Sequence, residues 1–310
     1  MASTRQPQPK VVVLLAVLIT VCCTSLWLLE TKFTLASMAQ VAASPVLPSS
    51  ALLAFRCCAV AVLVWTIYID QTDPTPLTIT PVRWEGSSLE GASILMRGST
   101  KFITFTVQCW TLHVVYFSGA VCCMLFERLD VYVSPTVSNI VGAGLSCAYE
   151  TSFACALLTT VCVTFVLIPD HAKRGVDPTP MFFSLKALLM HNANVVLMAS
   201  ELLFNSLAIE VVHFPVCVLW GCYYVLFAWC VLRVKGAVLY PFLDPTLRRA
   251  VLLHLALMSA MATFFVLGAA ADAAASRMPA AMRIAVVYAG CAAIMRTRTI
   301  RGIPQVHKQA

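Results

Sequence analysis

Eight apolar blocks, most of them 18 or more residues long, are the feature of this 310-residue chain that most constrains its fold. Short charged stretches separate blocks at residues 11–29, 51–69, 102–126, 139–168, 181–204, 212–232, 250–271 and 280–295. A helix of about 20 apolar residues is long enough to cross the ~30 Å hydrocarbon core of a bilayer. The pattern therefore predicts an all-α polytopic transmembrane helix bundle with about six to eight spanning helices.

The composition excludes a soluble protein of this length. Hydrophobic residues make up 60% of the chain and charged residues only 11%, whereas a soluble domain carries about 25% charged residues. We expect a single transmembrane domain over 1–310, with cytoplasmic tails at 1–10 and 296–310. The connection 70–101, rich in Pro, Gly and Ser, is expected to be a cytoplasmic loop with a short interfacial helix over 88–97.

The basic residues predict the orientation in the membrane. If all eight blocks cross, one side holds fifteen basic residues: Arg5, Lys10, Arg83, Arg97, Lys101, Lys173, Arg174, Arg233, Lys235, Arg248, Arg249, Arg296, Arg298, Arg301 and Lys308. The other side holds three: Lys32, Arg128 and Arg277. Cytoplasmic loops carry the excess of Lys and Arg, so both termini are predicted to be cytoplasmic. The membrane is expected to be the endoplasmic reticulum or plasma membrane.

The net charge of +7 lies at the ends of the blocks, where anionic lipid head groups are found. Membrane lipids are therefore the expected partners, and nucleic acid is not. The 14 cysteines include no CxxC motif and no Cys/His spacing that suits zinc. We expect neither a metal nor a cofactor.

The block 181–204 has the densest set of intramembrane polar residues. With Asn205 just beyond the block, the set is Lys186, His191, Asn192, Asn194, Glu201 and Asn205. At about 100° per residue, the stripe on one face of the helix contains His191, Asn194, Met198, Glu201 and Asn205. Such a stripe must face other helices or a polar cavity. Two interpretations stay open: hydrogen bonds that fix helix packing, or a polar functional pocket.

Other blocks carry fewer polar residues. Thr104, Gln108 and Thr111 share one face of the block 102–126, whereas Thr106 and His113 lie on nearly the opposite face. Glu150 is a further acid inside a span, and its expected partner is either Lys186 or Arg56.

The region 213–245 contains a run of aromatic residues that ends in Gly236-Ala237-Val238-Leu239-Tyr240-Pro241-Phe242-Leu243-Asp244. Gly236 allows the backbone to turn after a helix, and Pro241 prevents the helix from resuming. The aromatic residues are expected to be core residues and interface anchors.

Three stretches resemble the androgen-induced (androgen-dependent) integral membrane protein family, whose studied members hydrolyse fatty-acid esters of hydroxy fatty acids, and the related rolling stone-like membrane proteins. The stretches are Gly98-Ser99-Thr100-Lys101-Phe102-Ile103-Thr104-Phe105, His191-Asn192-Ala193-Asn194, and Gly236 through Leu243. They define a family-like core over 98–245.

The resemblance implies an intramembrane Thr nucleophile, here Thr104, and a later His as its base. The family has two histidines three residues apart, but this chain has His191 at the first position and Asn194 at the second, where the base is expected. The first hypothesis is therefore a lipid-ester hydrolase with Thr104 and His191 as catalytic residues. Gln108 or Asn194 would polarise the substrate carbonyl, and Glu201 and Asn205 would complete a polar pocket.

Two alternatives belong to other functional classes. In the first, the protein is a non-enzymatic membrane scaffold or a fusion or morphogenesis factor, and the polar stripe only orders the helices. In the second, it is a small-solute or proton-coupled transporter in which Glu150, Glu201 and His191 line a water path.

Overall fold

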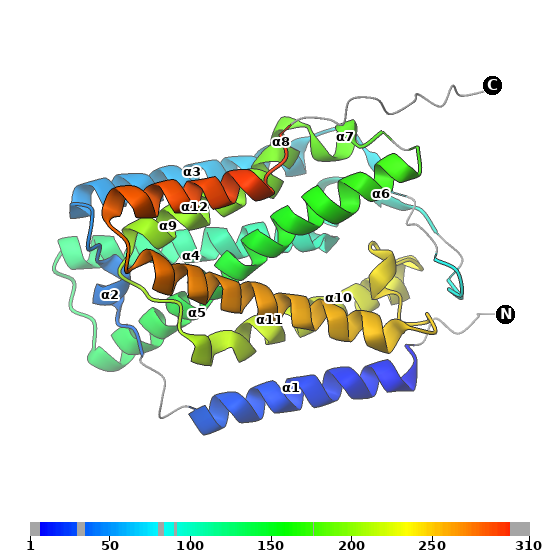
Figure 1. Ribbon diagram of the computed structural model, residues 1–310, viewed down its shortest axis with the longest axis horizontal. Helices are drawn as coiled ribbons and strands as arrows, with labels where there is room; N and C mark the ends of the chain where they lie inside the picture. The colour runs from blue at the N-terminus through cyan, green and yellow to red at the C-terminus, as the bar shows by residue number, and fades with distance from the viewer. Residues whose placement is uncertain (1–6, 30–34, 80–83, 90–91, 176, 298–310) are drawn as a thin grey trace. The chain divides into compact units, whose positions relative to one another are not determined.

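A computed structural model describes residues 7–29, 35–79, 84–89, 92–175 and 177–297. The apolar blocks fold as helices (Figure 1). The uninterrupted ones are α1 (Pro9–Leu29), α3 (Ser49–Thr72), α4 (Phe105–Arg128), α10 (Phe214–Lys235), α11 (Ala250–Ala275) and the shorter α12 (Ala280–Ile294). Two more spans consist of several helical pieces.

The first composite span runs over Pro135–Lys173. It comprises α5 (Pro135–Cys162), a π-helical segment (Val163–Leu167) and α6 (Ile168–Lys173). The second runs over Leu185–Phe204 and comprises α8 (Leu185–Leu188), a π-helical segment (Leu189–Ala193) and α9 (Asn194–Phe204). Two short helices, α2 (Met38–Ala42) and α7 (Thr179–Phe182), lie in the connections.

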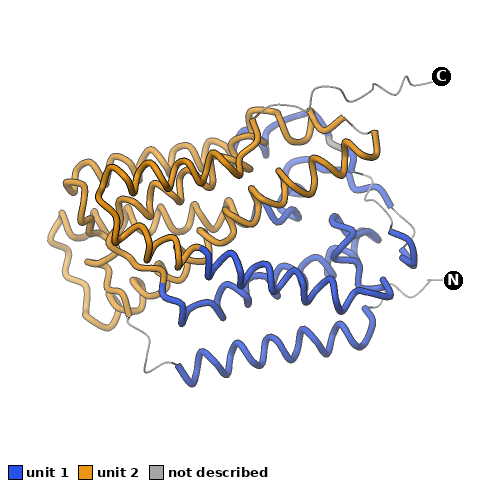
Figure 2. Tube along the Cα trace, in the orientation of Figure 1, with its two compact units in different colours: residues 1–34, 68–108, 210–267 blue, residues 35–67, 109–209, 268–310 orange. Residues whose placement is uncertain are grey.

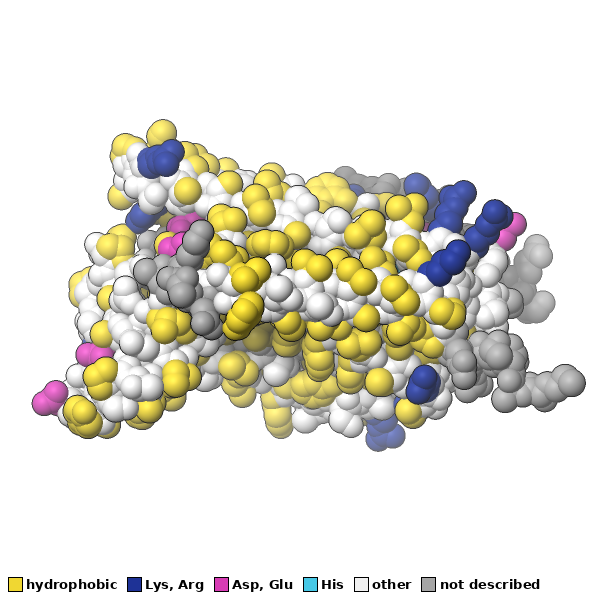
Figure 3. Space-filling model, turned by 90° about the horizontal axis from the view of Figure 1, so that it is seen from below, with side chains coloured by type: hydrophobic (Ala, Val, Ile, Leu, Met, Phe, Trp, Pro, Cys, Tyr) yellow, Lys and Arg dark blue, Asp and Glu magenta, His cyan; other side chains and the backbone are white. Residues whose placement is uncertain are grey.

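Within the described residues, seven helices are long and apolar enough to cross a membrane. The chain is thus a multi-pass integral membrane protein built as an all-α helix bundle. Its surface is suited to contact with lipid, because many apolar side chains lie on the exposed helix faces (Figure 3). Trp27 is 69% exposed and Val64 49% exposed, as expected of side chains that face lipid.

The helix ends follow from local sequence. Ser134 precedes α5 and its side chain accepts a hydrogen bond from the Val137 amide, while Pro135 occupies the first turn, where no amide donor is needed. At the end of α10, Gly236 adopts a left-handed conformation with φ of 76°, which confirms the helix stop predicted there. Pro241 begins a separate 3₁₀ turn, Pro241–Leu243.

The connection after α3 contains a two-stranded antiparallel sheet. Strand β1 (Leu77–Ile79) pairs with β2 (Ile94–Met96). The predicted interfacial helix over 88–97 is therefore wrong where β2 lies. The reason is a two-residue alternation, because Ile94 and Met96 are each 2% exposed and Leu95 is 55% exposed.

Contacts along the chain divide it into two compact units (Figure 2). Unit 1 comprises 1–34, 68–108 and 210–267, and unit 2 comprises 35–67, 109–209 and 268–310. The contact pattern does not show whether the two units fold together, so the single transmembrane domain stays a prediction. Parts of the predicted cytoplasmic tails lie outside the described residues, as do the basic residues Arg5, Lys32, Arg83, Arg298, Arg301 and Lys308.

In unit 1 the connections meet each other. The Gln8 side chain, just before α1, donates to the carbonyls of Thr246 at 2.9 Å and Leu247 at 2.8 Å. Ser87, in the connection between α3 and α4, donates to the Asp244 carboxylate. The N-terminal segment and the connections after α3 and α10 therefore lie together within unit 1. In the predicted topology an even number of crossings separates each pair of them, and that topology stays a prediction.

Unit 2 has an equivalent meeting of connections. Ser206 Oγ donates to the Gln40 carbonyl at 2.7 Å, which joins the segment after α9 to the segment before α3. The Ile209 amide donates to Asp272 Oδ2, near the end of α11, at 2.9 Å. In the predicted topology these segments, too, are separated by even numbers of crossings.

The helix α12 runs antiparallel beside α9. Arg283 near its start donates to the carbonyl of Leu203 at 3.3 Å, and the carbonyl of Arg296 after its end accepts from Asn192 at 3.0 Å. At 1.5 Å per residue, its 15 residues extend about 22 Å. This path follows most of the neighbouring span, although the eighth crossing itself stays a prediction.

Candidate functional site

Thr104 lies where the 3₁₀ turn Gly98–Ile103 gives way to α4. Its hydroxyl donates to the carbonyl of Lys101 at 3.0 Å and accepts from the amide of Val107 at 3.2 Å. This second bond is that of an N-cap, which satisfies one of the free amides at the start of a helix. Thr104 thus has a structural role in unit 1 whatever its chemistry.

Side chains hold the backbone just before α4. Gln108 Nε2 donates to the carbonyl of Phe102 at 3.0 Å, and the Tyr224 hydroxyl donates to the carbonyl of Ile103 at 2.9 Å. Gln108 Oε1 is buried and has no hydrogen-bond partner among the described residues. One N–H of the Gln108 amide group therefore holds the backbone before α4, while its carbonyl oxygen has no partner there.

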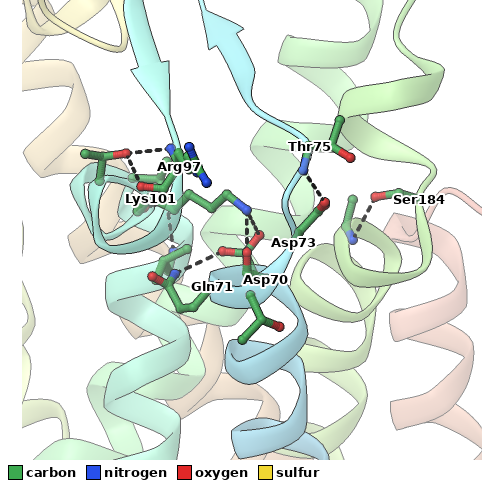
Figure 4. Close-up of polar contacts among 12 residues, drawn as sticks. Asp70, Gln71, Asp73, Thr75, Arg97, Lys101 and Ser184 are labelled. Atoms are coloured by element: carbon green, nitrogen blue, oxygen red, sulfur yellow. Dashed lines mark hydrogen bonds and ion pairs between the residues drawn. The ribbon is translucent and has the colours of Figure 1, made fainter.

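Lys101 ties the same segment to the end of α3 (Figure 4). Its ammonium group donates to the carbonyl of Asp70 and lies 3.5 Å from Asp70 Oδ1. Gln71 Nε2 donates to the other carboxylate oxygen at 3.2 Å. A cation at the last turn of a helix satisfies the free carbonyls and the negative end of the helix dipole.

His191 lies in unit 2, inside the π-helical segment Leu189–Ala193. Its ring centroid is 5.9 Å from that of Phe182, and its backbone carbonyl accepts a 2.7 Å hydrogen bond from Thr160. The Nδ1 atom is buried and has no partner in the described part of the chain. Single π-helical turns inside α-helices are frequent at functional sites.

Asn194 faces α5. Its Oδ1 accepts from Thr160 Oγ1 at 3.1 Å and from the amide of Val195 at 2.7 Å. Its Nδ2 donates to the carbonyl of Ala156 at 3.4 Å. The side chain at the position expected for the catalytic base is therefore engaged by helix contacts.

The π-helical segment also changes the predicted polar stripe. A π-helix turns less per residue than an α-helix, so His191 does not keep the angular register with Asn194 that a regular helix gives. Accordingly, the ring of His191 contacts Phe182, whereas Asn194 contacts α5. Predicting one stripe through His191 was wrong for this reason.

Glu201 is the centre of the most buried polar cluster, which we call the Arg56 node: Val41, Arg56, Tyr116, Glu201 and Asn205. Arg56 Nη2 lies 2.5 Å from Glu201 Oε1, and both side chains are 0% exposed. The Tyr116 hydroxyl donates to the same carboxylate oxygen at 2.6 Å, and Asn205 Nδ2 does so at 3.5 Å. Arg56 Nη1 donates to the carbonyl of Val41 at 2.7 Å.

The Arg56 node corrects one of the two predicted partners of Glu150, namely Arg56, whereas the pairing of Glu150 with Lys186 stays a prediction. Arg56 forms its ion pair with Glu201, and Glu150 accepts a 3.4 Å hydrogen bond from Ser146 on its own helix. Sequence identified Arg56 as a charge inside a span but gave no signal that chooses between acids on two helices. Tyr116 had no signal at all, because a tyrosine among apolar residues is most simply a core residue.

The candidate residues fall in two groups. Thr104 and Gln108 belong to unit 1, whereas His191, Asn194, Glu201 and Asn205 belong to unit 2. A cavity shared by Thr104 and His191 stays a prediction. Across the described ranges, no group of three or more His, Cys, Asp or Glu side chains could hold a metal ion.

Comparisons of this chain with protein-family models, with characterised proteins and with solved structures give no significant match.

Proposed function

We propose that the protein is a diverged member of the androgen-induced/rolling stone-like group that acts as a non-enzymatic membrane scaffold. The observation that carries the proposal is the state of Asn194. The hydrolase branch needs a histidine base at this position, and an amide does not accept a proton at neutral pH. Here the amide instead joins two helices through Thr160 and Ala156.

The Arg56 node supports the same proposal. The node joins α2, which contains Val41, to α3, α4 and α9. Each nitrogen of the Arg56 guanidinium group has a hydrogen-bond acceptor. A buried ion pair contributes little net stability against apolar residues of similar size, but it can select one helix arrangement. A scaffold needs such a defined arrangement.

The membrane and the orientation are part of the proposal: the endoplasmic reticulum or plasma membrane, with both termini cytoplasmic. The connections that meet in unit 1 carry exposed basic residues, namely Lys10, Arg97, Arg233, Lys235, Arg248 and Arg249. A surplus of Lys and Arg marks the cytoplasmic side. Epitope tags at both ends should be accessible in cells only after the plasma membrane is permeabilised.

The scaffold proposal is tested with purified protein and a fluorophosphonate probe of the serine-hydrolase type. We expect no covalent labelling of the wild-type protein, together with a lower thermal midpoint for Glu201→Gln. Labelling that disappears in Thr104→Ala would contradict the proposal.

A second candidate is a lipid-ester hydrolase with Thr104 as nucleophile and His191 as base. It is favoured by the unpartnered Nδ1 of His191 and by the position of Thr104 at the start of α4, where the helix dipole stabilises negative charge. Here the Thr104 hydroxyl would exchange its bond to Lys101 for one to the base. Labelling lost in Thr104→Ala and His191→Ala, and kept in the control Thr106→Ala, would establish it.

A further inference from the structure

Unit 2 contains buried polar atoms that none of the helix contacts use. Among the described residues of this unit, the following buried side-chain atoms have no hydrogen-bond partner: His113 Nε2, the Tyr149 hydroxyl oxygen, Thr151 Oγ1, Ser152 Oγ, Thr159 Oγ1, His191 Nδ1 and Arg283 Nε. A buried group without a partner costs about 1–3 kcal/mol, and lipid cannot supply one. These atoms do not stabilise the bundle, in contrast to Asn194 and Glu201.

His113 has a defined protonation pattern. Its Nδ1 contacts the carbonyl of Cys109 one turn earlier on α4, and a carbonyl can only accept, so Nδ1 carries the hydrogen. In the neutral ring Nε2 is then the proton acceptor. The side chain is 0% exposed, so this acceptor lies inside the unit.

Two contacts fix how α4 and α5 align. A Cβ on Gly119 would lie 2.4 Å from a methyl carbon of Leu145, and the rings of Tyr116 and Tyr149 are 5.4 Å apart. Going down α4 from 119 to 116 thus means going up α5 from 145 to 149, so the helices are antiparallel. One further turn in each helix brings His113 and Ser152 to the same level.

The helix α9 extends this order. Glu201 accepts from Tyr116, and Asn194 accepts from Thr160. Along the helix axes the polar groups therefore follow one another in a fixed order. Tyr116 and Glu201 come first, His113 and Ser152 next, then Thr159, and last His191 in the π-helical segment. The ten residues from His191 to Glu201 correspond to about 15 Å along the helix, half of the ~30 Å hydrocarbon core.

We propose that unit 2 conducts protons along this column, from His191 through Thr159, Ser152 and His113 to Glu201. Imidazole nitrogens and carboxylates take up and release protons, and hydroxyls accept one hydrogen bond while donating another. Water molecules bridge the steps, since they too donate and accept. Each carrier releases one proton for each that it receives, so only O–H and N–H bonds form and break. The hydroxyls and water molecules then rotate back before the next proton passes.

The proposal goes beyond the scaffold function and does not depend on it. Side chains that join the helices, such as Asn194 and Thr160, have hydrogen-bond partners. The column consists mainly of side chains with a buried polar atom that has no such partner among the described residues. Intramembrane chains of acidic residues and histidines are typical of proton relays. The total burial of His113 and Ser152 suits a proton better than a larger solute.

The test is proton flux through the full-length protein in liposomes of phosphatidylcholine and phosphatidylglycerol that contain a pH-sensitive dye. A pH step is applied in the presence of potassium and valinomycin, which remove any opposing voltage. We expect wild-type vesicles to lose the pH gradient faster than protein-free vesicles. The variants His113→Phe and Ser152→Ala should return the rate to the protein-free level.

Thr151→Val is the matched control. It removes another buried, unpartnered hydroxyl from α5, but one residue away and hence about 100° around the helix from Ser152, so flux should remain at the wild-type rate. If His113→Phe does not fold, as judged by its thermal midpoint, His113→Gln replaces it and should also abolish flux. Wild-type flux equal to protein-free vesicles, or an equal loss in Thr151→Val and Ser152→Ala, would overturn the proposal.

Discussion

Two ion pairs of this protein differ in their surroundings. Arg56 and Glu201 meet in the interior of unit 2, where both side chains are 0% exposed and Tyr116 adds a third bond. Lys101 and Asp70 meet in unit 1 at the end of a span, beside a polar connection, with side chains 8% and 9% exposed. Both pairs join segments that are distant in sequence.

The comparison separates the effect of pairing from the effect of the solvent. At the end of a span, a group that loses its partner can turn to water or lipid head groups. In the interior of a span the only alternative is hydrocarbon, which offers no hydrogen bond. Removal of one charge from the pair should therefore lower the free energy of unfolding more at Glu201 than at Lys101.

The largest effect is expected for Glu201→Gln, which leaves the charge of Arg56 buried without a counter-charge. Removing one partner of a buried ion pair costs about 3–5 kcal/mol. The measurement is the free energy of unfolding by sodium dodecyl sulfate in mixed micelles. A value for Glu201→Gln close to wild type would show that the pair is hydrated.

Lys101→Met should have an intermediate effect. It keeps most of the side-chain volume but removes the donor that serves the backbone and carboxylate of Asp70. A lost hydrogen bond to a charged group costs about 1.5–3 kcal/mol, and nearby water should keep the effect at the lower end. If Lys101→Met destabilises more than Glu201→Gln in the same assay, the ordering by solvent is wrong.

Asn194→Ala should cost less, because interhelical hydrogen bonds in membranes average about 0.6 kcal/mol and reach about 1.7. The bonds lost are those to Thr160 and to the Ala156 carbonyl. The same unfolding assay measures the change, with Ser99→Ala as an exposed control. A loss as large as that of Glu201→Gln would indicate that Asn194 has partners beyond these helix contacts.

The smallest effect is expected for Asp170→Asn. Asp170 on α6 pairs with Arg174, the residue that follows the end of this helix, and the two side chains are 49% and 30% exposed. Exposed pairs of this spacing contribute about 0.3–0.5 kcal/mol, and salt should reduce that further. An unfolding free energy that changes strongly, or that does not respond to salt, would contradict this placement.

The spans were predictable because hydropathy measures what the bilayer requires. The block 51–69 became Ser49–Thr72, and the block 250–271 became Ala250–Ala275. The helix end at Gly236 was predictable for a local reason, its left-handed backbone. The antiparallel sheet was missed, because each strand has only three residues and a two-residue alternation that short is not distinctive.

The candidate site was predictable only in part. Polar residues inside apolar blocks showed where partners were needed, but the choice of Glu201 for Arg56 depends on the rotation and level of separate helices. The π-helical segments leave no mark on hydropathy. The sequence could therefore place His191 and Asn194 on one helix, but not show that they contact different neighbours.

The most direct test of the account is a double-mutant cycle on the Arg56 node, measured as unfolding free energy in mixed micelles. We predict that Arg56→Met and Glu201→Met each destabilise strongly, and that the double variant recovers most of the loss because neither charge is then left alone. Losses that simply add, with the double variant least stable of all, would contradict the claim that these two side chains form an ion pair inside the membrane.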